Sequence, residues 1–263
     1  MKSLTSKTEA ELVLSLSHPR IIKAKKYLPE VSISKQECLR PVLTSALVLE
    51  HATEGDLLQL IQKHQGLPEI VARTYFHQIL DAIEYLHTAQ ICHLDIKPEN
   101  VLLDKKFSVK LTDFGFAQKV SKEGTLTKVI GTKPFLTPEM HARQEYNAFQ
   151  SDLFALGLTL FIMVSGMMPF SVARADDEIY SLFKEEKYQE FWEVHEGLKK
   201  CSGNKFAGRT YYSGTLKSLM NSMLAYKPEN RLDLSQIRSH AWSKGSILSE
   251  EELDGYIRGL VTK

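Results

Sequence analysis

Apolar residues recur every three or four positions along much of this chain, which is the period of a helix with one buried face. The longest such stretch covers residues 68–88, where Pro68 at the first turn favours a helix start. Shorter helical patterns lie at residues 7–17, 57–64, 176–187, 214–225, 234–240 and 250–260. Helices should therefore form most of the structure.

Strand patterns are fewer and lie early in the chain. Apolar stretches at residues 21–28 and 42–49 flank a polar hairpin or loop, and the second stretch is rich in the Val and Leu typical of a strand. Residues 101–103 and 109–111 flank a run of turn residues and predict a short hairpin. Early strands followed by many helices predict an α+β fold.

A charge-free stretch at residues 153–173 has nearly the length needed to cross a bilayer. A helix that is apolar all round is buried either in lipid or in a large soluble core. Pro169 near its end and the polar sequence on both sides favour the core, so we expect a buried helix at 151–167 with Asp152 at its start. No membrane association is expected.

Composition narrows the class of protein. The 263 residues are 43% hydrophobic, which permits a sizeable core and excludes a disordered chain. Lys and Arg total 33 against 32 Asp and Glu, so the near-neutral chain has no overall field to recruit nucleic acid. The three cysteines lack zinc-site spacing, and the N-terminus lacks a secretory signal. We expect a cytoplasmic protein, with a nuclear location as the alternative.

The unusual chemistry gathers in CHLDIKPENVLLD, at residues 92–104, and in the LTDFGFA that follows it. The predicted hairpin should place two acidic loops side by side, so that Asp95, Asn100 and Asp113 converge. Carboxylate and amide oxygens are ligands that Mg²⁺ prefers. Lys97 lies two positions after Asp95 on an extended loop, faces the same way and can neutralise a phosphoryl group. Turn formation is the alternative role of these aspartates.

These motifs in this order resemble the eukaryotic protein kinases of the serine/threonine type. The resemblance implies a two-lobed fold in one domain over residues 1–263, with a partial small lobe at 1–52 and a complete helical lobe at 53–263. It also implies ATP and Mg²⁺ as cofactors and a protein Ser or Thr hydroxyl as acceptor. Asp95 would accept the hydroxyl proton, Lys97 would contact the γ-phosphate, and Asn100 and Asp113 would hold two magnesium ions.

Further positions match the family's pattern. His93 would be structural, Phe114 and Gly115 complete the metal motif, and Thr132 resembles the residue that favours hydroxyl substrates. Glu139 and Arg231 would form a buried ion pair, and Asp152 would anchor the catalytic loop. Nucleotide contacts would come from the hinge at Glu50 and Ala52 and from Asp56 near the ribose, and Glu9 aligns with the glutamate of the regulatory helix.

Two departures from the family's pattern change the activity and the regulation that we expect. The eight residues before Glu9 hold neither a Gly-rich loop nor a strand lysine, so we expect weak phosphoryl transfer from this chain alone and an exposed strand edge open to a protein partner. A pseudokinase or kinase fragment acting as a protein-binding scaffold is the alternative. Leu94 replaces an arginine that usually pairs with a phosphate, which argues against switching through Thr125 or Thr127.

The helical pattern at residues 250–260 is compatible with two roles. Leu253, Ile257 and Leu260 give it one narrow apolar stripe. The stripe suits either packing on the chain's own domain, which is the favoured use, or docking to a partner.

Overall fold

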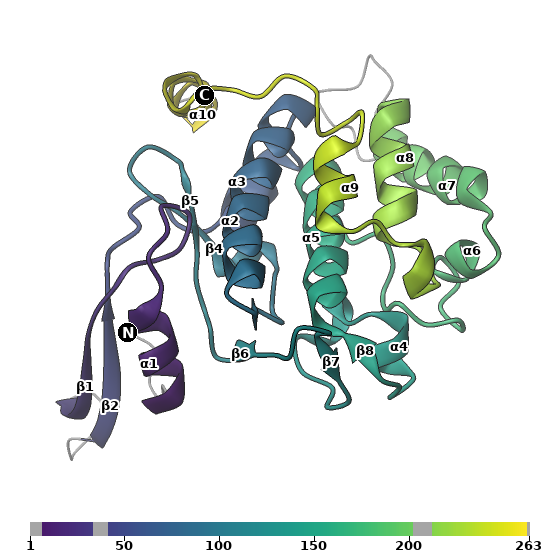
Figure 1. Cartoon of the computed structure of the whole chain (residues 1–263). Coiled ribbons are helices and arrows are strands. Elements are labelled where there is room, and N and C mark those ends of the chain that lie inside the picture. Colours follow the sequence, from purple (N-terminus) through teal and green to yellow (C-terminus); the bar gives the residue numbers. More distant parts are fainter. Residues whose placement is uncertain (1–6, 34–41, 202–211, 262–263) are drawn as a thin grey trace.

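The computed structural model describes residues 7–33, 42–201 and 212–261. Figure 1 shows helix α1 (Lys7–Ser15) and strands β1 (Ala24–Ile33) and β2 (Val42–Leu49) on one side of a larger helical body. This arrangement confirms the two-lobed α+β fold, with a small lobe that carries the longer strands and a mainly helical large lobe.

Strands β1 and β2 pair antiparallel, with Tyr27 opposite Leu47. The apolar stretch at residues 21–28 coincides only in part with strand β1, which begins and ends later in the chain. Ile22 instead donates its N–H to the Leu111 carbonyl at 2.9 Å, so the start of that stretch pairs with the large lobe. The strand continues to Ile33 through a register irregularity between Leu28 and Val31. Part of the predicted connecting loop lies outside the described residues.

Helices α2 (Leu57–His64), α3 (Glu69–Thr88) and α5 (Ala148–Ser165) follow the predicted ranges closely. Helix α3 packs on α5, and α5 packs on α8 (Gly214–Met223). The short hairpin of β4 (Val101–Leu103) and β5 (Val109–Leu111) has the predicted bounds. Short elements elsewhere in the large lobe include β3 (Ile91–Cys92), β6 (Gln118–Lys119), β7 (Thr125–Leu126), β8 (Tyr146–Asn147), α4 (Pro138–His141), α9 (Leu234–Ser239), and the 3-10 turns η1 (Pro98–Asn100), η2 (Lys133–Phe135) and η3 (Pro228–Asn230).

Helix α5 accounts for most of the charge-free stretch. Within the described residues it is the one helix long and apolar enough to cross a membrane, and 89% of it is buried inside the protein. It is therefore the central core helix. The expectation that Asp152 starts this helix was wrong, because the Asn147 side chain caps it by accepting the N–H of Gln150 at 3.0 Å. Asp152 lies in the second turn.

The helix predicted at 176–187 was also wrong. The Asp177 carboxylate accepts backbone N–H groups from Val172, Ile179 and Tyr180, which holds this region as a turn. Only α6 (Ser181–Lys184) is helical there. A longer helix that the sequence pattern did not predict, α7 (Tyr188–Cys201), follows it.

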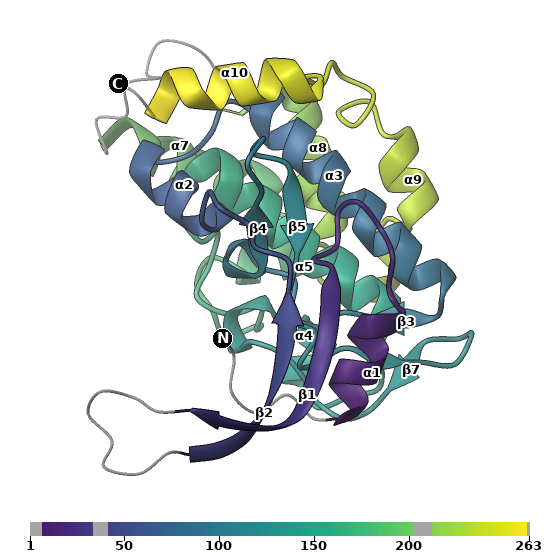
Figure 2. The same ribbon diagram turned by 90° about the vertical axis from the view of Figure 1, so that its left-hand side faces the viewer.

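Helix α10 (Glu250–Val261) packs on its own domain, the favoured of the two predicted uses. Leu253 and Ile257 are fully buried, and Arg258 donates to the carbonyl of Lys105 at 2.7 Å. Glu250 pairs with Arg20 at 2.9 Å, on the segment that leads into β1. Figure 2 shows α10 lying across one end of the molecule, near α2 and α3.

Candidate active site

A cavity of about 610 Å³ lies between the small lobe and the loops of the β4–β5 hairpin. Its apolar wall includes Val13 of α1, Leu28 of β1 and Ala46 of β2. Asn100 and Asp113 line the side that belongs to the large lobe. An apolar wall facing a few polar groups is typical of a binding site for a small molecule.

Asp95 is the centre of a hydrogen-bonded group at the edge of this cavity. Asn100 donates from Nδ2 to Oδ2 of Asp95 at 2.8 Å, and Thr132 donates from Oγ1 to Oδ1 at 2.5 Å. The Nζ of Lys97 lies 2.8 Å from Oδ2 of Asp95 and donates to Thr132 Oγ1 at 2.6 Å. The structure thus brings together four residues that the sequence singled out.

This environment sets the protonation state of Asp95. Burial raises the pKa of the carboxyl, but the hydrogen bonds from Lys97, Thr132 and Asn100 outweigh burial and hold the pKa below its usual value. Asp95 is therefore an ionised acceptor at neutral pH. A positioned carboxylate of this kind can take a proton from a hydroxyl group.

Asn100 and Asp113 fit a magnesium site. Both line the same cavity, and they offer one amide oxygen and one carboxylate, the hard donors that Mg²⁺ takes together with waters and substrate oxygens. Because Asn100 donates from its Nδ2 to Asp95, its Oδ1 is the atom that can bind a cation. Asp113 also accepts the N–H of Gly115 at 3.3 Å, which holds the turn after the predicted metal ligand.

His93 lies between the loop of Asp95 and the loop of Asp113. It is fully buried, its Nε2 lies 3.0 Å from the carbonyl oxygen of Thr112, and its ring meets that of Phe114 edge-on at 4.9 Å. Burial lowers the pKa of His93, so the ring stays neutral. The ring therefore ties the loop of Asp95 to the loop of Asp113.

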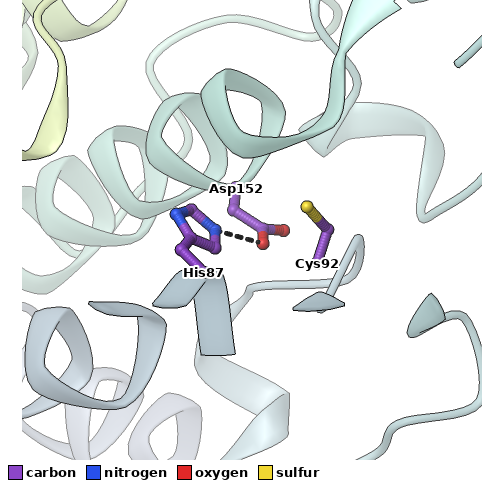
Figure 3. A group of neighbouring side chains, drawn as sticks. All are labelled: His87, Cys92 and Asp152. Carbon is purple, nitrogen blue, oxygen red and sulfur yellow. Dashed lines mark hydrogen bonds and ion pairs between the residues drawn. The ribbon is translucent and has the colours of Figure 1, made fainter. Parts of the chain in front are cut away.

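Asp152 anchors the loop that carries Asp95. One carboxylate oxygen accepts the N–H of Leu94 at 2.8 Å, and the other accepts the N–H of His93 and lies near His87 Nε2, both at 2.9 Å. Figure 3 shows His87 and Cys92 on either side of the Asp152 carboxylate. The anchoring of this loop by Asp152 was expected, but the sequence pattern did not indicate that His87 and Cys92 would flank the carboxylate, because both are remote from Asp152 in the chain.

His87, Cys92 and Asp152 offer three ligand atoms that lie within 4.8 Å of one another. Both oxygens of Asp152 are already occupied by N–H donors, and burial raises the pKa of the Cys92 thiol. Structural zinc sites also use four ligands rather than three. The group is therefore better explained as a hydrogen-bonded anchor than as a metal site.

The predicted nucleotide contacts separate into two groups. Glu50 lines the cavity, and its Oε1 accepts the N–H of Lys23 at 2.9 Å and lies 3.1 Å from Lys110 Nζ. Partial burial raises the pKa of Glu50, but these contacts hold it below its usual value. Ala52 and Asp56 are outside the cavity lining, and Asp56 caps α2 by accepting the N–H of Gln59 at 2.8 Å. Their contact with a nucleotide stays a prediction.

Two further acids line the cavity. Glu9 lies in the first turn of α1 and faces the cavity from the small lobe. Glu99 lies in the turn η1, directly before Asn100, and the sequence pattern did not indicate that it would reach this cavity.

Leu94 packs into an apolar cluster beneath the segment that follows Asp113. The cluster consists of Cys92, Leu94, Leu136, Met140, Tyr146 and Ala148, with Val120, Leu126, Ile130 and Phe149 packed against it. The pairing of β7 with β8 fastens the same segment to the start of α5. Gly131 is required there, because an added Cβ would lie 2.5 Å from the Leu94 carbonyl oxygen. Leu94 stands where the family's pattern has an arginine, and apolar contacts around Leu94 hold this segment in place.

The comparisons with known proteins agree with this geometry. A sequence profile of the protein kinase domain matches residues 2–243. CBL-interacting protein kinase 11 of Oryza sativa is 30% identical over 244 residues, which are 92% of this chain and 43% of that protein.

Two other relatives give the same assignment. The carbon catabolite-derepressing protein kinase of Secale cereale is 31% identical over 90% of this chain and 41% of its own length. The human SNF-related serine/threonine-protein kinase is 36% identical over 76% of this chain and 24% of its own length. The chain thus spans less than half the length of these relatives. Nearly all of it matches the one domain, and the chain belongs to the protein kinase domain family.

Proposed function

We propose that this chain is an ATP-dependent protein kinase that transfers the γ-phosphoryl group to Ser or Thr hydroxyls of a protein substrate. The observation that supports this most is the hydrogen-bonded group of Asp95, Lys97 and Thr132 beside a cavity lined by Asn100 and Asp113. Each of these side chains has a chemical task in such a transfer.

The ionised Asp95 accepts the proton of the substrate hydroxyl while the oxygen of that hydroxyl forms a bond to the γ-phosphorus. The bond between the γ-phosphorus and the oxygen that bridges it to the β-phosphate breaks, and ADP leaves. Lys97, held 2.8 Å from Asp95, stabilises the negative charge on the phosphoryl group. Asn100 and Asp113 would hold Mg²⁺, which supplies charge neutralisation on the phosphate oxygens when bound.

Thr132 supports hydroxyl substrates. Its hydroxyl contacts both Asp95 and Lys97, so it fixes the distance between the proton acceptor and the cation. Without this contact Asp95 and Lys97, which lie 2.8 Å apart, lose a hydrogen bond that orients both side chains, and looser orientation lowers the rate of transfer.

A protein-binding scaffold is the second candidate. Within the described residues β1 and β2 pair only with each other, and a strand edge of this kind can take up a strand from another protein. The same small lobe presents no Gly-rich loop over the cavity in residues 7–33 and 42–49, which contain no glycine. Slow transfer is therefore expected from this chain.

The test is transfer of labelled γ-phosphate to a mixture of Ser- and Thr-containing peptides by the purified chain with Mg²⁺. Asp95→Asn should abolish transfer, whereas Asp254→Asn, a change on α10 outside the cavity lining, should not. Absence of transfer above the Asp95→Asn background, in a chain that still unfolds cooperatively, would contradict the kinase proposal and leave the scaffold as the better account.

A further inference from the structure

The segment between Asp113 and Glu139 is basic, although the net charge of the whole chain is only +1. Glu123 is the one acid of this segment, and its four lysines are Lys119, Lys122, Lys128 and Lys133. All four lysine side chains are exposed, and none forms an ion pair with an acid in the part of the chain that the structure describes. Positive charge is thus concentrated on one exposed segment.

Lys133 is the lysine of this segment that lies nearest to the proton acceptor of the proposed reaction. The residue before it, Thr132, donates from its backbone N–H and from its hydroxyl to Oδ1 of Asp95, at 3.1 and 2.5 Å. Phe135, two residues after Lys133, is buried and donates its N–H to the Thr132 carbonyl at 2.9 Å. The backbone of Lys133 is therefore held from both sides, and a hydroxyl that reaches Asp95 comes close to this lysine.

A hollow of about 360 Å³ lies beside α4, which follows the basic segment, and Arg174 and His141 are part of its lining. Burial lowers the pKa of His141, and the positive charges of Arg174 and Lys133 lower it further, so both cations lie within electrostatic range of this ring. Asp176 is the one acid among the described lining residues, and it pairs with Arg174 at 2.6 Å. A second cation is therefore available on the same side of the molecule as Lys133.

We propose that Lys133 determines the choice of protein substrate by pairing with an acidic side chain within two residues of the Ser or Thr that accepts the phosphoryl group. The inference rests on the proposed function and names its substrate class, which is proteins with Asp or Glu close to the acceptor. An exposed ion pair contributes little by itself. Lys133 is positioned in advance by its anchored neighbours, however, and the other lysines of the segment attract the same charge at longer range. Arg174 offers a further cation to a longer acidic run.

Binding and phosphorylation of three synthetic peptides test the proposal. Each peptide has one Ser in an Ala- and Gly-rich sequence, and the two residues on either side of the Ser are all Asp, all Ala or all Lys. Fluorescence anisotropy with an uncharged dye measures the affinity, and transfer of labelled γ-phosphate with Mg²⁺ gives kcat/KM. At low salt we expect both quantities to be about tenfold higher for the Asp peptide than for the Lys peptide, and screening should shrink this difference as salt rises.

Lys106 offers a matched control for Lys133. Both side chains are exposed, but Lys106 lies in the turn between β4 and β5, outside the basic segment. Lys133→Glu should reverse the preference between the Asp and Lys peptides, whereas Lys106→Glu should leave this preference unchanged. Both variants should unfold at the urea concentration that unfolds the unaltered chain, because exposed side chains contribute little to stability.

Equal affinity and equal transfer for the Asp and Lys peptides, or a preference that Lys133→Glu does not change, would overturn this inference. If the chain phosphorylated all three peptides alike, the proposed function would stand and the inference alone would fail. If the Asp peptide bound through Lys133 but no peptide were phosphorylated above the Asp95→Asn background, recognition of an acidic segment by Lys133 would stand and the kinase proposal would fail.

Discussion

Glu139 and Arg231 form a two-point ion pair across 92 residues of sequence. Arg231 donates from Nη1 and Nη2 to the two carboxylate oxygens at 2.7 and 2.8 Å. Its Nε donates to the carbonyl of Ala225 at 2.8 Å, and its guanidinium lies over the ring of Phe154 at 5.0 Å. Both charged side chains are almost fully buried. The pair therefore connects the end of the segment after Asp113 to the helical core.

Removing one partner of this pair should be costly. Glu139→Gln leaves the guanidinium of Arg231 buried without its counter-charge, and we expect the free energy of unfolding in urea to fall by about 3–5 kcal/mol. Glu84→Gln is the control, because Glu84 pairs with Arg238 at a half-exposed site and should cost under about 1 kcal/mol. Equal losses in the two variants would contradict the structural role of the buried pair.

The anchor at Asp152 gives a second prediction. An amide at this position can accept through one atom only, so Asp152→Asn leaves the N–H of His93 or Leu94 buried without an acceptor. We expect a loss of about 1–3 kcal/mol in unfolding free energy and faster amide hydrogen exchange at residues 93–95. Loss of stability with unchanged exchange there would place the effect elsewhere in α5.

Adding zinc to the chain tests whether the three residues in Figure 3 form a hydrogen-bonded anchor or a metal site. If His87, Cys92 and Asp152 serve as an anchor, then adding Zn²⁺ should leave the melting temperature of the chain unchanged. Cys92→Ser should respond to Zn²⁺ in the same way as the unaltered chain. A rise in melting temperature that requires Cys92 would instead identify a metal site, because a ligand that binds the folded state stabilises it.

Local spacing explains what the sequence could predict. The hairpin β4–β5 has its predicted bounds. A tight hairpin brings the loops before and after it together, so the sequence near the hairpin was enough to predict that Asp95, Asn100 and Asp113 lie close to one another. Helices α2 and α3 were predicted almost to the residue because their apolar period continues without interruption.

Long-range contacts explain what it could not. Ile22 has the same apolar character as the strand after it, but it pairs with Leu111 in the other lobe. Asp177 lies within the helix predicted at 176–187, yet its carboxylate accepts N–H groups from both sides, and the helix there begins only at Ser181. The role of Glu99 at the cavity likewise depends on how the two lobes meet.

The depressed pKa of Asp95 predicts a particular acid sensitivity. A carboxyl whose folded-state pKa is lowered contributes stability above its ordinary value near 3.8, and this contribution is lost as the pH falls through the folded-state value. Asp95→Asn should therefore be less stable than the unaltered chain at neutral pH but lose less stability between about pH 5 and pH 3. Urea unfolding across this range measures the slope. Glu193→Gln, which alters an exposed acid on α7, is the control variant.

The apolar cluster around Leu94 predicts an ordered segment without phosphorylation. Leu126 packs against this cluster from β7 and pairs with Tyr146, whereas the neighbouring Thr125 and Thr127 side chains are exposed. In the unphosphorylated chain we therefore expect protected amides at residues 124–128. Leu126→Ala removes apolar contacts of this partly buried side chain and should speed exchange across this segment by roughly threefold to tenfold, because partial burial leaves only part of the ~2–5 kcal/mol that truncating a fully buried leucine costs.

Val129→Ala is the matched control for this change. Val129 lies on the same segment but is 39% exposed, so its truncation removes little packing and should leave exchange almost unchanged. Leu94→Arg should loosen the segment as Leu126→Ala does, because a charged side chain would replace one that is buried in the cluster. Rapid exchange at residues 124–128 in the unaltered chain, slowed only after Thr125 or Thr127 is phosphorylated, would show that a phosphate orders this segment and would reject the apolar account.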